Sequence, residues 1–288
     1  MTEDLRAKAI ALYDRFTHEG LDRRAFMTRM TALAASLAAA EVLIATIAAD
    51  PAAAAVVPVD DKRLRTATVA PIPCLTAYMA TPRRTSGRLA TVIVIHENRG
   101  LTDHIRDIAR RLALAGYVAI APDFLSPAGG TPANEDQARD LIGKLDLGAA
   151  TGSALALLAA LKARRGGNGR VGVVGFCWGG AFVNRLAVAA GAKLDAGVAY
   201  YGPAPALAEA IKVEAPLMLH YAGLDTRVDA TGKPWVAALQ AAHKRVEAFT
   251  YPGVNHAFNN DTSAERFNAP AAALAWSRTL AFFARTLV

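Results

Sequence analysis

Short apolar segments alternate with longer amphipathic ones from residue 66 onward. Residues 91–95 (T-V-I-V-I) are continuously apolar, as expected for a strand buried on both faces of a sheet. Helices are expected at 103–115, within 135–163 and at 269–286. The other expected strands are 66–72, 75–80, 118–121, 171–174, 197–201, 216–221 and 247–251. The pattern predicts an α/β fold, with a mostly parallel sheet of about eight strands, helices on both faces and an antiparallel edge.

The expected strand at 171–174 is followed by G-F-C-W-G-G and then by an apolar helical segment. This order matches the nucleophile elbow G-x-S-x-G, with Cys177 in place of Ser. The turn lifts the thiol to a helix N-terminus, where unpaired N–H groups favour negative charge. The backbone N–H of Trp178 would then face a developing oxyanion. A buried structural cysteine is the alternative, and the order of strand, turn and helix favours the nucleophile.

A carboxylate and a histidine follow later strands, in the order that this kind of site requires. Asp225 comes just after the strand ending at residue 221, and His256 lies in the loop after the strand ending at 251. His256 is the candidate base, and Asp225 would orient it. Asp229 is an alternative acid. His220, inside a strand, and His243, on an expected helix, are interpreted as structural.

The strand at 91–95 ends in H-E-N-R-G, residues 96–100. In this architecture the loop after that strand supplies the second oxyanion donor, here expected to be the N–H of Asn98. Glu97 has a plainer interpretation as a helix-capping or ion-pairing residue. Four residues near the expected site are candidates to contact substrate: Arg99, Phe124, Tyr201 and Phe258.

Other signals in the chain exclude several classes of function. Gly167, Gly169 and Gly172 match G-x-G-x-x-G, but they precede and enter a strand, so a dinucleotide site is rejected. Cys74 and Cys177 form no metal-ligand cluster with the histidines, and no metal or cofactor is expected. The formal net charge of +7 includes six basic residues within 56–90, which we interpret as a solvated basic edge. No nucleic-acid partner is expected, and no oligomeric state is indicated.

The N-terminal sequence has the features of an export signal. Residues 22–27 read D-R-R-A-F-M, an apolar small-residue stretch runs from 30 to 49, and the sequence around 51–55 offers A-x-A-like cleavage positions. This resembles a twin-arginine signal, so we expect residues 1–60 to be a signal-like helical segment with a linker, and the protein to be periplasmic.

Glu41 interrupts the apolar stretch, so no uncharged run reaches the ~18 residues of a membrane span. The alternative to an export signal is a pair of structural helices on a cytoplasmic protein. The first of these helices would be lined by Leu5, Ile10, Leu12 and Phe16.

Taken together, the H-E-N-R-G loop, the G-F-C-W-G-G elbow, the G-x-D acid and the Y-P-G-x-x-H-A-F loop resemble the dienelactone hydrolase (carboxymethylenebutenolidase) family. The resemblance covers about residues 66–288 and implies an α/β-hydrolase fold for a domain at 61–288. It implies a triad of Cys177, Asp225 and His256, with Trp178 and Asn98 as backbone oxyanion donors. It also implies that Glu97 contacts the nucleophile in the resting enzyme and moves when substrate binds.

One departure concerns the substrate. The family binds a substrate carboxylate with two arginines, one in the loop after the fourth strand and one four residues after the histidine. Here the loop 123–127 contains no Arg, and the second position is Asn260. We therefore expect a cofactor-free cysteine hydrolase of small esters or lactones whose substrate differs from the family's namesake. A thioesterase or acyl-transfer enzyme on the same triad, or a non-catalytic binding protein, are the alternatives.

Overall fold

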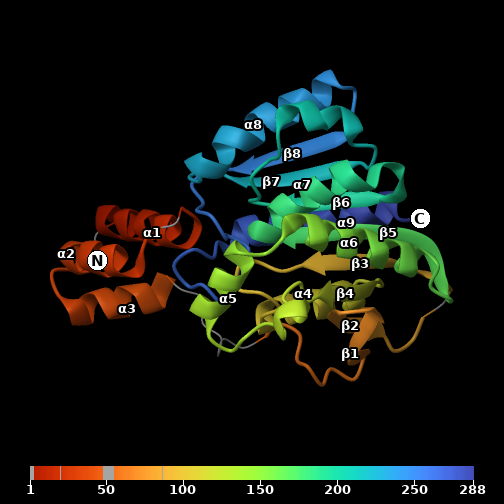
Figure 1. The fold of residues 1–288 in the computed structure, drawn as a ribbon, viewed down its shortest axis with the longest axis horizontal. Helices are drawn as coiled ribbons and strands as arrows, with labels where there is room; N and C mark the ends of the chain where they lie inside the picture. Colours follow the sequence, from red (N-terminus) through yellow and green to blue (C-terminus); the bar gives the residue numbers. More distant parts are fainter. Residues whose placement is uncertain (1–2, 20, 48–54, 86) are drawn as a thin grey trace.

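An eight-stranded sheet runs through the centre of the computed structural model, which describes residues 3–19, 21–47, 55–85 and 87–288 (Figure 1). The strand order is β1-β2-β4-β3-β5-β6-β7-β8, with β1 and β2 as an antiparallel edge and parallel pairing from β4 through β8. The strands are β1 (Leu64–Ile72), β2 (Leu75–Pro82), β3 (Leu89–Ile95), β4 (Val118–Pro122), β5 (Gly167–Phe176), β6 (Ala196–Tyr200), β7 (Leu217–Ala222) and β8 (Val246–Tyr251). The predicted architecture is confirmed.

Helices cover both faces of the sheet (Figure 1). Ile108 and Phe283, from α4 and α9, belong to the core on one face, whereas Leu157, Phe182 and Trp235, from α6, α7 and α8, belong to the core on the other. The helices are α4 (Asp103–Leu114), α5 (Glu135–Gly143), α6 (Leu147–Lys162), α7 (Trp178–Ala190), α8 (Thr226–Ala241) and α9 (Ala269–Thr286). Because the parallel strands end at one edge, the loops after β3, β5, β7 and β8 come together there.

Two helical features differ from the sequence pattern. The helical region expected at 135–163 is two helices, because Asp146 accepts hydrogen bonds from the N–H groups of Gly148 and Ala149 and so caps a new helix. The sequence analysis placed His243 on a helix after the strand at 216–221 but gave no bounds for α8. This helix contains Pro234, a residue that disfavours helix interiors.

The N-terminal residues form three helices at one side of the sheet, α1 (Glu3–His18), α2 (Arg23–Ala34) and α3 (Leu37–Ile47) (Figure 1). They have a small core of their own, made by Ala9, Ile10, Tyr13, Phe16, Phe26, Met30, Ala40, Leu43 and Ile47. The carboxylate of Asp22 accepts a hydrogen bond from Ala25, so the Arg23-Arg24 pair opens a capped helix. A packed helical unit agrees with the structural alternative for this segment, with three helices instead of two.

The expected cleavage positions lie almost entirely outside the described residues, and export stays a prediction. Within the described ranges no single helix is long and apolar enough to cross a membrane. Two bent helix pairs, α2 with α3 and α5 with α6, have the combined length and apolar composition of a span, by length and composition only.

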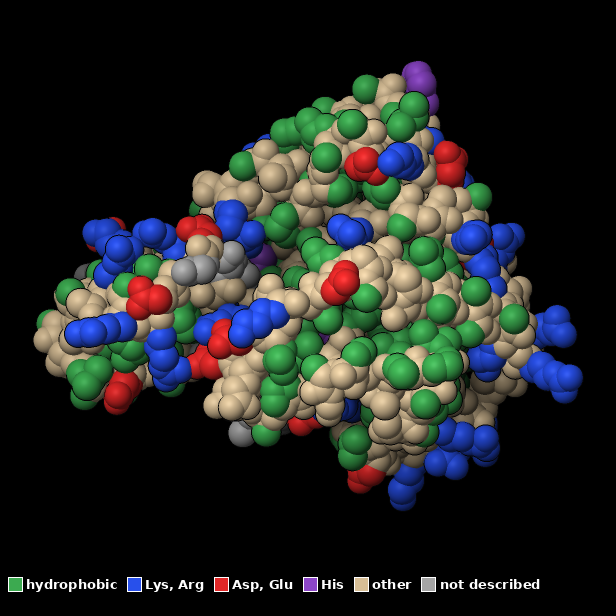
Figure 2. All heavy atoms as spheres, in the orientation of Figure 1, with side chains coloured by type: hydrophobic (Ala, Val, Ile, Leu, Met, Phe, Trp, Pro, Cys, Tyr) green, Lys and Arg blue, Asp and Glu red, His purple; other side chains and the backbone are tan. Residues whose placement is uncertain are grey.

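Basic side chains occupy much of the rim of the face drawn in Figure 2, including the N-terminal helices and the opposite end of the molecule. Two ion pairs of basic residues are Arg63 with Asp61, at 2.6 Å, and Lys162 with Asp195, at 2.5 Å. Arg63 belongs to the basic segment 56–90 and its side chain is 70% exposed, so its ion pair is screened by solvent. The interpretation of this segment as a solvated basic edge stays a prediction.

Candidate active site

Cys177 lies in the tight turn between β5 and α7, with φ 54° and ψ −114°, a conformation that a residue with a side chain rarely adopts. Its neighbours are glycines because the backbone approaches closely on both sides. A Cβ on Gly175 would lie 2.2 Å from the carbonyl oxygen of Gly179, and one on Gly179 would lie 2.4 Å from that of Ile95. The turn therefore holds a 5% exposed thiol at the N-terminus of α7, beside the first N–H group of Trp178.

His256 and Asp225 come from the loops after β8 and β7 and meet beside this turn. His256 Nδ1 lies 2.5 Å from the Asp225 carboxylate, which also accepts the backbone N–H of Val228 at 3.2 Å as the cap of α8. The imidazole is hydrogen-bonded to the thiol of Cys177 as well. The imidazole and its carboxylate partner are both buried, His256 at 2% and Asp225 at 8% exposure. The three predicted triad residues are thus in one chain of hydrogen bonds.

The charges in this chain reinforce one another. Burial alone would lower the pKa of His256, but the negative charges of Cys177 and Asp225 outweigh it and raise that pKa to about 10. Burial would likewise raise the pKa of Asp225, but the charge and hydrogen bond of His256, together with the charge of Arg227, lower it. The imidazolium form of His256 is therefore favoured when Cys177 is a thiolate.

The loop after β3 forms the opposite side of the site. Glu97, Asn98, Cys177 and His256 line one cavity of about 30 Å³. The Glu97 carboxylate accepts a hydrogen bond of 2.9 Å from the side chain of Asn260. Glu97 therefore lines the same cavity as the thiol, and its carboxylate is held by Asn260, the residue at the missing arginine position. Its expected contact with the nucleophile stays a prediction.

The four candidate substrate contacts have different surroundings. Arg99 lines the cavity with Cys177, where its guanidinium contacts Glu135 and the Tyr13 hydroxyl. Phe124, Tyr201 and Phe258 are buried at 2%, 0% and 0% exposure. These three rings are absent from the cavity walls around Cys177. They pack behind the site, against Trp178 and His256 among others, so they support the catalytic side chains from the core.

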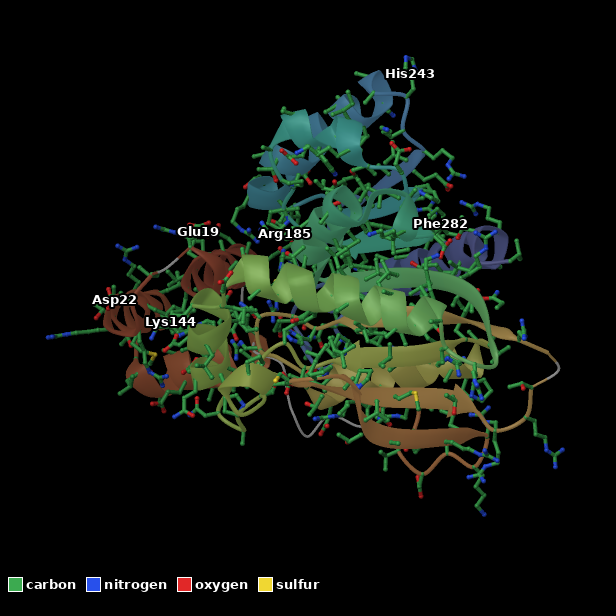
Figure 3. The ribbon with its side chains drawn as sticks, turned by 45° about the vertical axis from the view of Figure 1, so that its right-hand side comes forward. Glu19, Asp22, Lys144, Arg185, His243 and Phe282 are labelled. Atoms are coloured by element: carbon green, nitrogen blue, oxygen red, sulfur yellow. The ribbon has the colours of Figure 1, made fainter. Side chains whose placement is uncertain are left out.

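The rejected histidines and the alternative acid lie elsewhere. His220 is buried in β7, where its ring bonds the hydroxyl groups of Tyr251 and Thr279. His243 was expected on a helix, but it follows the end of α8 in a turn with positive φ, at the top of the view in Figure 3 and away from the N-terminal helices. Asp229 pairs with Lys233 at 2.9 Å. Among the residues that the structure describes, no group of His, Cys, Asp or Glu could hold a metal ion.

The sequence analysis missed the residues that α1 brings to the site. Tyr13 and Thr17 line the cavity that contains Cys177 and His256, as does Arg266 from the loop after His256. The amphipathic pattern of residues 3–18 indicates that α1 packs against another part of the protein. It does not indicate that this part is the loop after β3. Within the described residues neither cysteine forms a disulfide, and Cys74 is exposed whereas Cys177 is buried.

Comparison with known proteins decides the family, because the dienelactone hydrolase family matches residues 75–287. The chain belongs to the dienelactone hydrolase family. A carboxymethylenebutenolidase homologue of Escherichia coli O157:H7 is 36% identical over 222 residues, which cover 72% of this chain and 81% of the relative. One from Saccharolobus solfataricus is 34% identical over 245 residues, covering 73% and 93%.

Among solved structures, a dienelactone hydrolase homologue from Klebsiella pneumoniae is 31% identical, with a TM-score of 0.66, and covers 77% of this chain and 98% of that one. This dienelactone hydrolase family member is accordingly a hydrolase of the ester and lactone class.

Proposed function

We propose that this protein hydrolyses small esters or lactones through an acyl-cysteine intermediate on Cys177. The observation that carries the proposal is the hydrogen-bonded chain from the thiol through His256 to Asp225, at a strained turn on a helix N-terminus. A thiolate in this position has both an imidazolium neighbour and an uncapped helix end, and each favours its negative charge.

In the first half of the reaction, the Cys177 sulfur attacks the substrate carbonyl carbon and forms a C–S bond. The negative charge that develops on the carbonyl oxygen is met by the backbone N–H groups of Trp178 and Asn98. The tetrahedral intermediate then collapses, the C–O bond to the leaving group breaks, and His256 gives its proton to the departing oxygen. Asp225 holds the imidazole in orientation throughout.

In the second half, His256 takes a proton from a water molecule, which attacks the acyl carbon. The C–S bond breaks, the acid product leaves, and the thiolate–imidazolium pair is restored. Glu97 lines the same cavity as the thiol. Its carboxylate is a like charge next to the thiolate, so we expect it to move when a substrate enters.

The test combines turnover with detection of the intermediate. Cys177→Ala should abolish hydrolysis of methyl and ethyl esters, and a slow ester should leave an acyl adduct on Cys177 detectable by mass spectrometry of the intact protein. The exposed Cys74 supplies the matched control, because Cys74→Ser should retain both turnover and the adduct.

Two results would contradict the proposal. Full activity in Cys177→Ala would exclude the thiol as nucleophile. Absence of both turnover and adduct across esters and lactones would favour a non-catalytic binding protein with this fold.

A further inference from the structure

Two cavities of very different size meet at Cys177. The first, about 30 Å³, is lined by His256, Asn260 and Arg266 and by Tyr13 and Thr17 of α1. The second is a groove of about 360 Å³. Thr17 and Asn98 line both spaces and therefore stand between them.

The larger groove has an apolar lining on the α5, α6 and α7 side, which includes Ile142, Leu145, Leu147 and Trp178. His256 lines the small cavity and not this groove. The two spaces that Cys177 lines therefore differ both in volume and in access to the proton donor.

The reaction chemistry assigns a role to each space. In hydrolysis on Cys177, the departing oxygen must receive its proton from His256 within hydrogen-bond reach. The leaving group consequently lies on the side of the thiol that His256 lines, which is the small cavity. The acyl group, which stays on the sulfur, extends to the other side, into the groove. A volume of about 30 Å³ holds on the order of two water molecules. A leaving group of a few heavy atoms therefore fits without reaching the neighbouring space of about 240 Å³, which Glu97, Arg99 and Asn260 also line.

Helix α1 builds the outer wall of the small cavity through contacts with the loop after β3. The side chain of Asn98 donates a hydrogen bond of 3.0 Å to the backbone carbonyl of Thr17, and Arg99 donates one of 2.9 Å to the Tyr13 hydroxyl. Thr17 is 8% and Tyr13 3% exposed. The helix is thus joined directly to the loop expected to supply an oxyanion donor.

The loop after His256 holds the same helical unit from the other side. Arg266 lies 3.5 Å from the carboxylate of Asp14, and its guanidinium carbon is 5.2 Å from the centre of the Tyr13 ring. Farther along, the Ser263 hydroxyl donates to the carbonyl of Ile47 at 2.7 Å.

Helix α5 is the third support of this unit. The guanidinium carbon of Arg139 lies 4.2 Å from the centre of the Phe16 ring, and Arg23 pairs with Asp136. Figures 1 and 3 both draw α5 beside the N-terminal helices. Docking from three directions fixes α1 over the catalytic residues.

We propose that α1 is a wall of the active site, and that Tyr13 and Thr17 restrict the leaving group to a few atoms while the groove takes a larger acyl group. The proposal rests on the proposed function and specifies its substrate class: esters of a large acid with a small alcohol. For a lactone, the restriction applies to the substituents on the ring carbon that carries the leaving oxygen. Thioesters of bulky thiols are excluded, which separates this enzyme from the thioesterase alternative.

The experiment uses the full chain and two ester series. In the first, the acyl group is hexanoyl and the alcohol grows from methyl to ethyl, butyl and benzyl. In the second, the alcohol is methyl and the acyl group grows from acetyl to octanoyl. We expect kcat/KM to fall by at least about tenfold from methyl to butyl hexanoate, the usual effect of methylene groups that a pocket cannot accept. Along the acyl series kcat/KM should not fall.

Two variants of Thr17 test the wall in both directions. Among the described residues its hydroxyl donates to carbonyl groups of α1 itself, so Thr17→Ala leaves the contact with Asn98 in place. We expect Thr17→Ala to raise the butyl-to-methyl ratio of kcat/KM at least about fivefold, and Thr17→Met to lower the ethyl-to-methyl ratio. Tyr13→Phe, which keeps the ring volume, should retain the wild-type ratio. The matched control is Lys8→Ala, at an exposed position of the same helix.

The outcomes separate this inference from the proposed function. If methyl esters are cleaved and acylate Cys177, but butyl and benzyl esters are cleaved as fast, α1 does not restrict the leaving group and only this inference fails. A wild-type ratio in a correctly folded Thr17→Ala overturns it in the same way, with folding checked by thermal melting. If no ester is cleaved and no adduct forms, the proposed function fails and this inference fails with it.

Discussion

Replacing Gly175 by Ala tests the nucleophile turn most directly. A Cβ at this position would lie 2.2 Å from the carbonyl oxygen and 2.5 Å from the carbonyl carbon of Gly179, and 3.0 Å from a methyl group of Val183. The two shortest contacts are with backbone atoms of Gly179, so rotation of a side chain cannot relieve them. The start of α7 therefore has to move away from β5 by about 1 Å to restore ordinary contact distances. Overpacking of this kind typically costs about 1–3 kcal/mol.

A displacement of about 1 Å in the nucleophile can lower turnover about a hundredfold. We therefore expect Gly175→Ala to lose about 1–3 kcal/mol of unfolding free energy in urea titration and most of its kcat/KM on a methyl ester. Gly152 is the matched control, because it lies in α6 with no heavy atom within 4 Å of an added Cβ. Gly152→Ala should raise the unfolding free energy by about 0.5–1 kcal/mol and retain activity. A stable and fully active Gly175→Ala would refute the close approach of β5 and α7.

Three further predictions concern substitutions of charged side chains. Asp225→Asn removes the carboxylate from His256 and should lower kcat/KM at least ten- to a hundredfold, since a charge-assisted hydrogen bond contributes about 1.5–3 kcal/mol; an unchanged kcat/KM would remove Asp225 from the site. The hydrogen bond of His104 and the charge of Arg111 outweigh burial and lower the pKa of Asp261 to about 2. Asp261→Asn should therefore lose about 1 kcal/mol of unfolding free energy at pH 7 after allowance for solvent screening. The difference in unfolding free energy between wild type and Asp261→Asn should vanish as the pH falls below about 4 and through 2. A difference that does not depend on pH would contradict this prediction. For export, changing Arg23 and Arg24 to Lys keeps the charge and should retain the protein in the cytoplasm; wild-type protein found only in the cytoplasm on fractionation would disprove the signal.

The sheet, the nucleophile turn and the positions of the acid and the histidine could be predicted because each depends on local pattern. An apolar strand followed by Gly-x-Cys-x-Gly specifies a turn, and parallel strands carry their following loops to one edge. Asp225 and His256 could thus be placed near Cys177 although they are 48 and 79 residues away in the sequence. The hydrogen bond between them is consistent with the same rule.

What the pattern could not predict are contacts that depend on side-chain direction and on docking between distant segments. Phe124, Tyr201 and Phe258 lie near strand ends, where a side chain can face the cavity or the core, and all three face the core. The packing of α1 on the loop of Asn98 involves residues 81 positions apart and no recognisable motif. An amphipathic helix shows that it has a partner and gives no information on which one.

The residues that would select the leaving group and the residues that carry out the reaction lie in different parts of the chain: the former on α1, the latter in the loops after the strands. The family match begins at residue 75, so the helix carrying Tyr13 lies outside the part of the sequence that the family shares. Loss of the first 47 residues, by processing or by truncation for expression, would leave every hydrogen bond between Cys177, His256 and Asp225 available, yet expose the leaving-group side to solvent. A grafted or redesigned N-terminal helix is correspondingly a way to change the accepted alcohol without altering a catalytic loop, and an N-terminal tag that displaces this helix would broaden the apparent specificity of the purified enzyme.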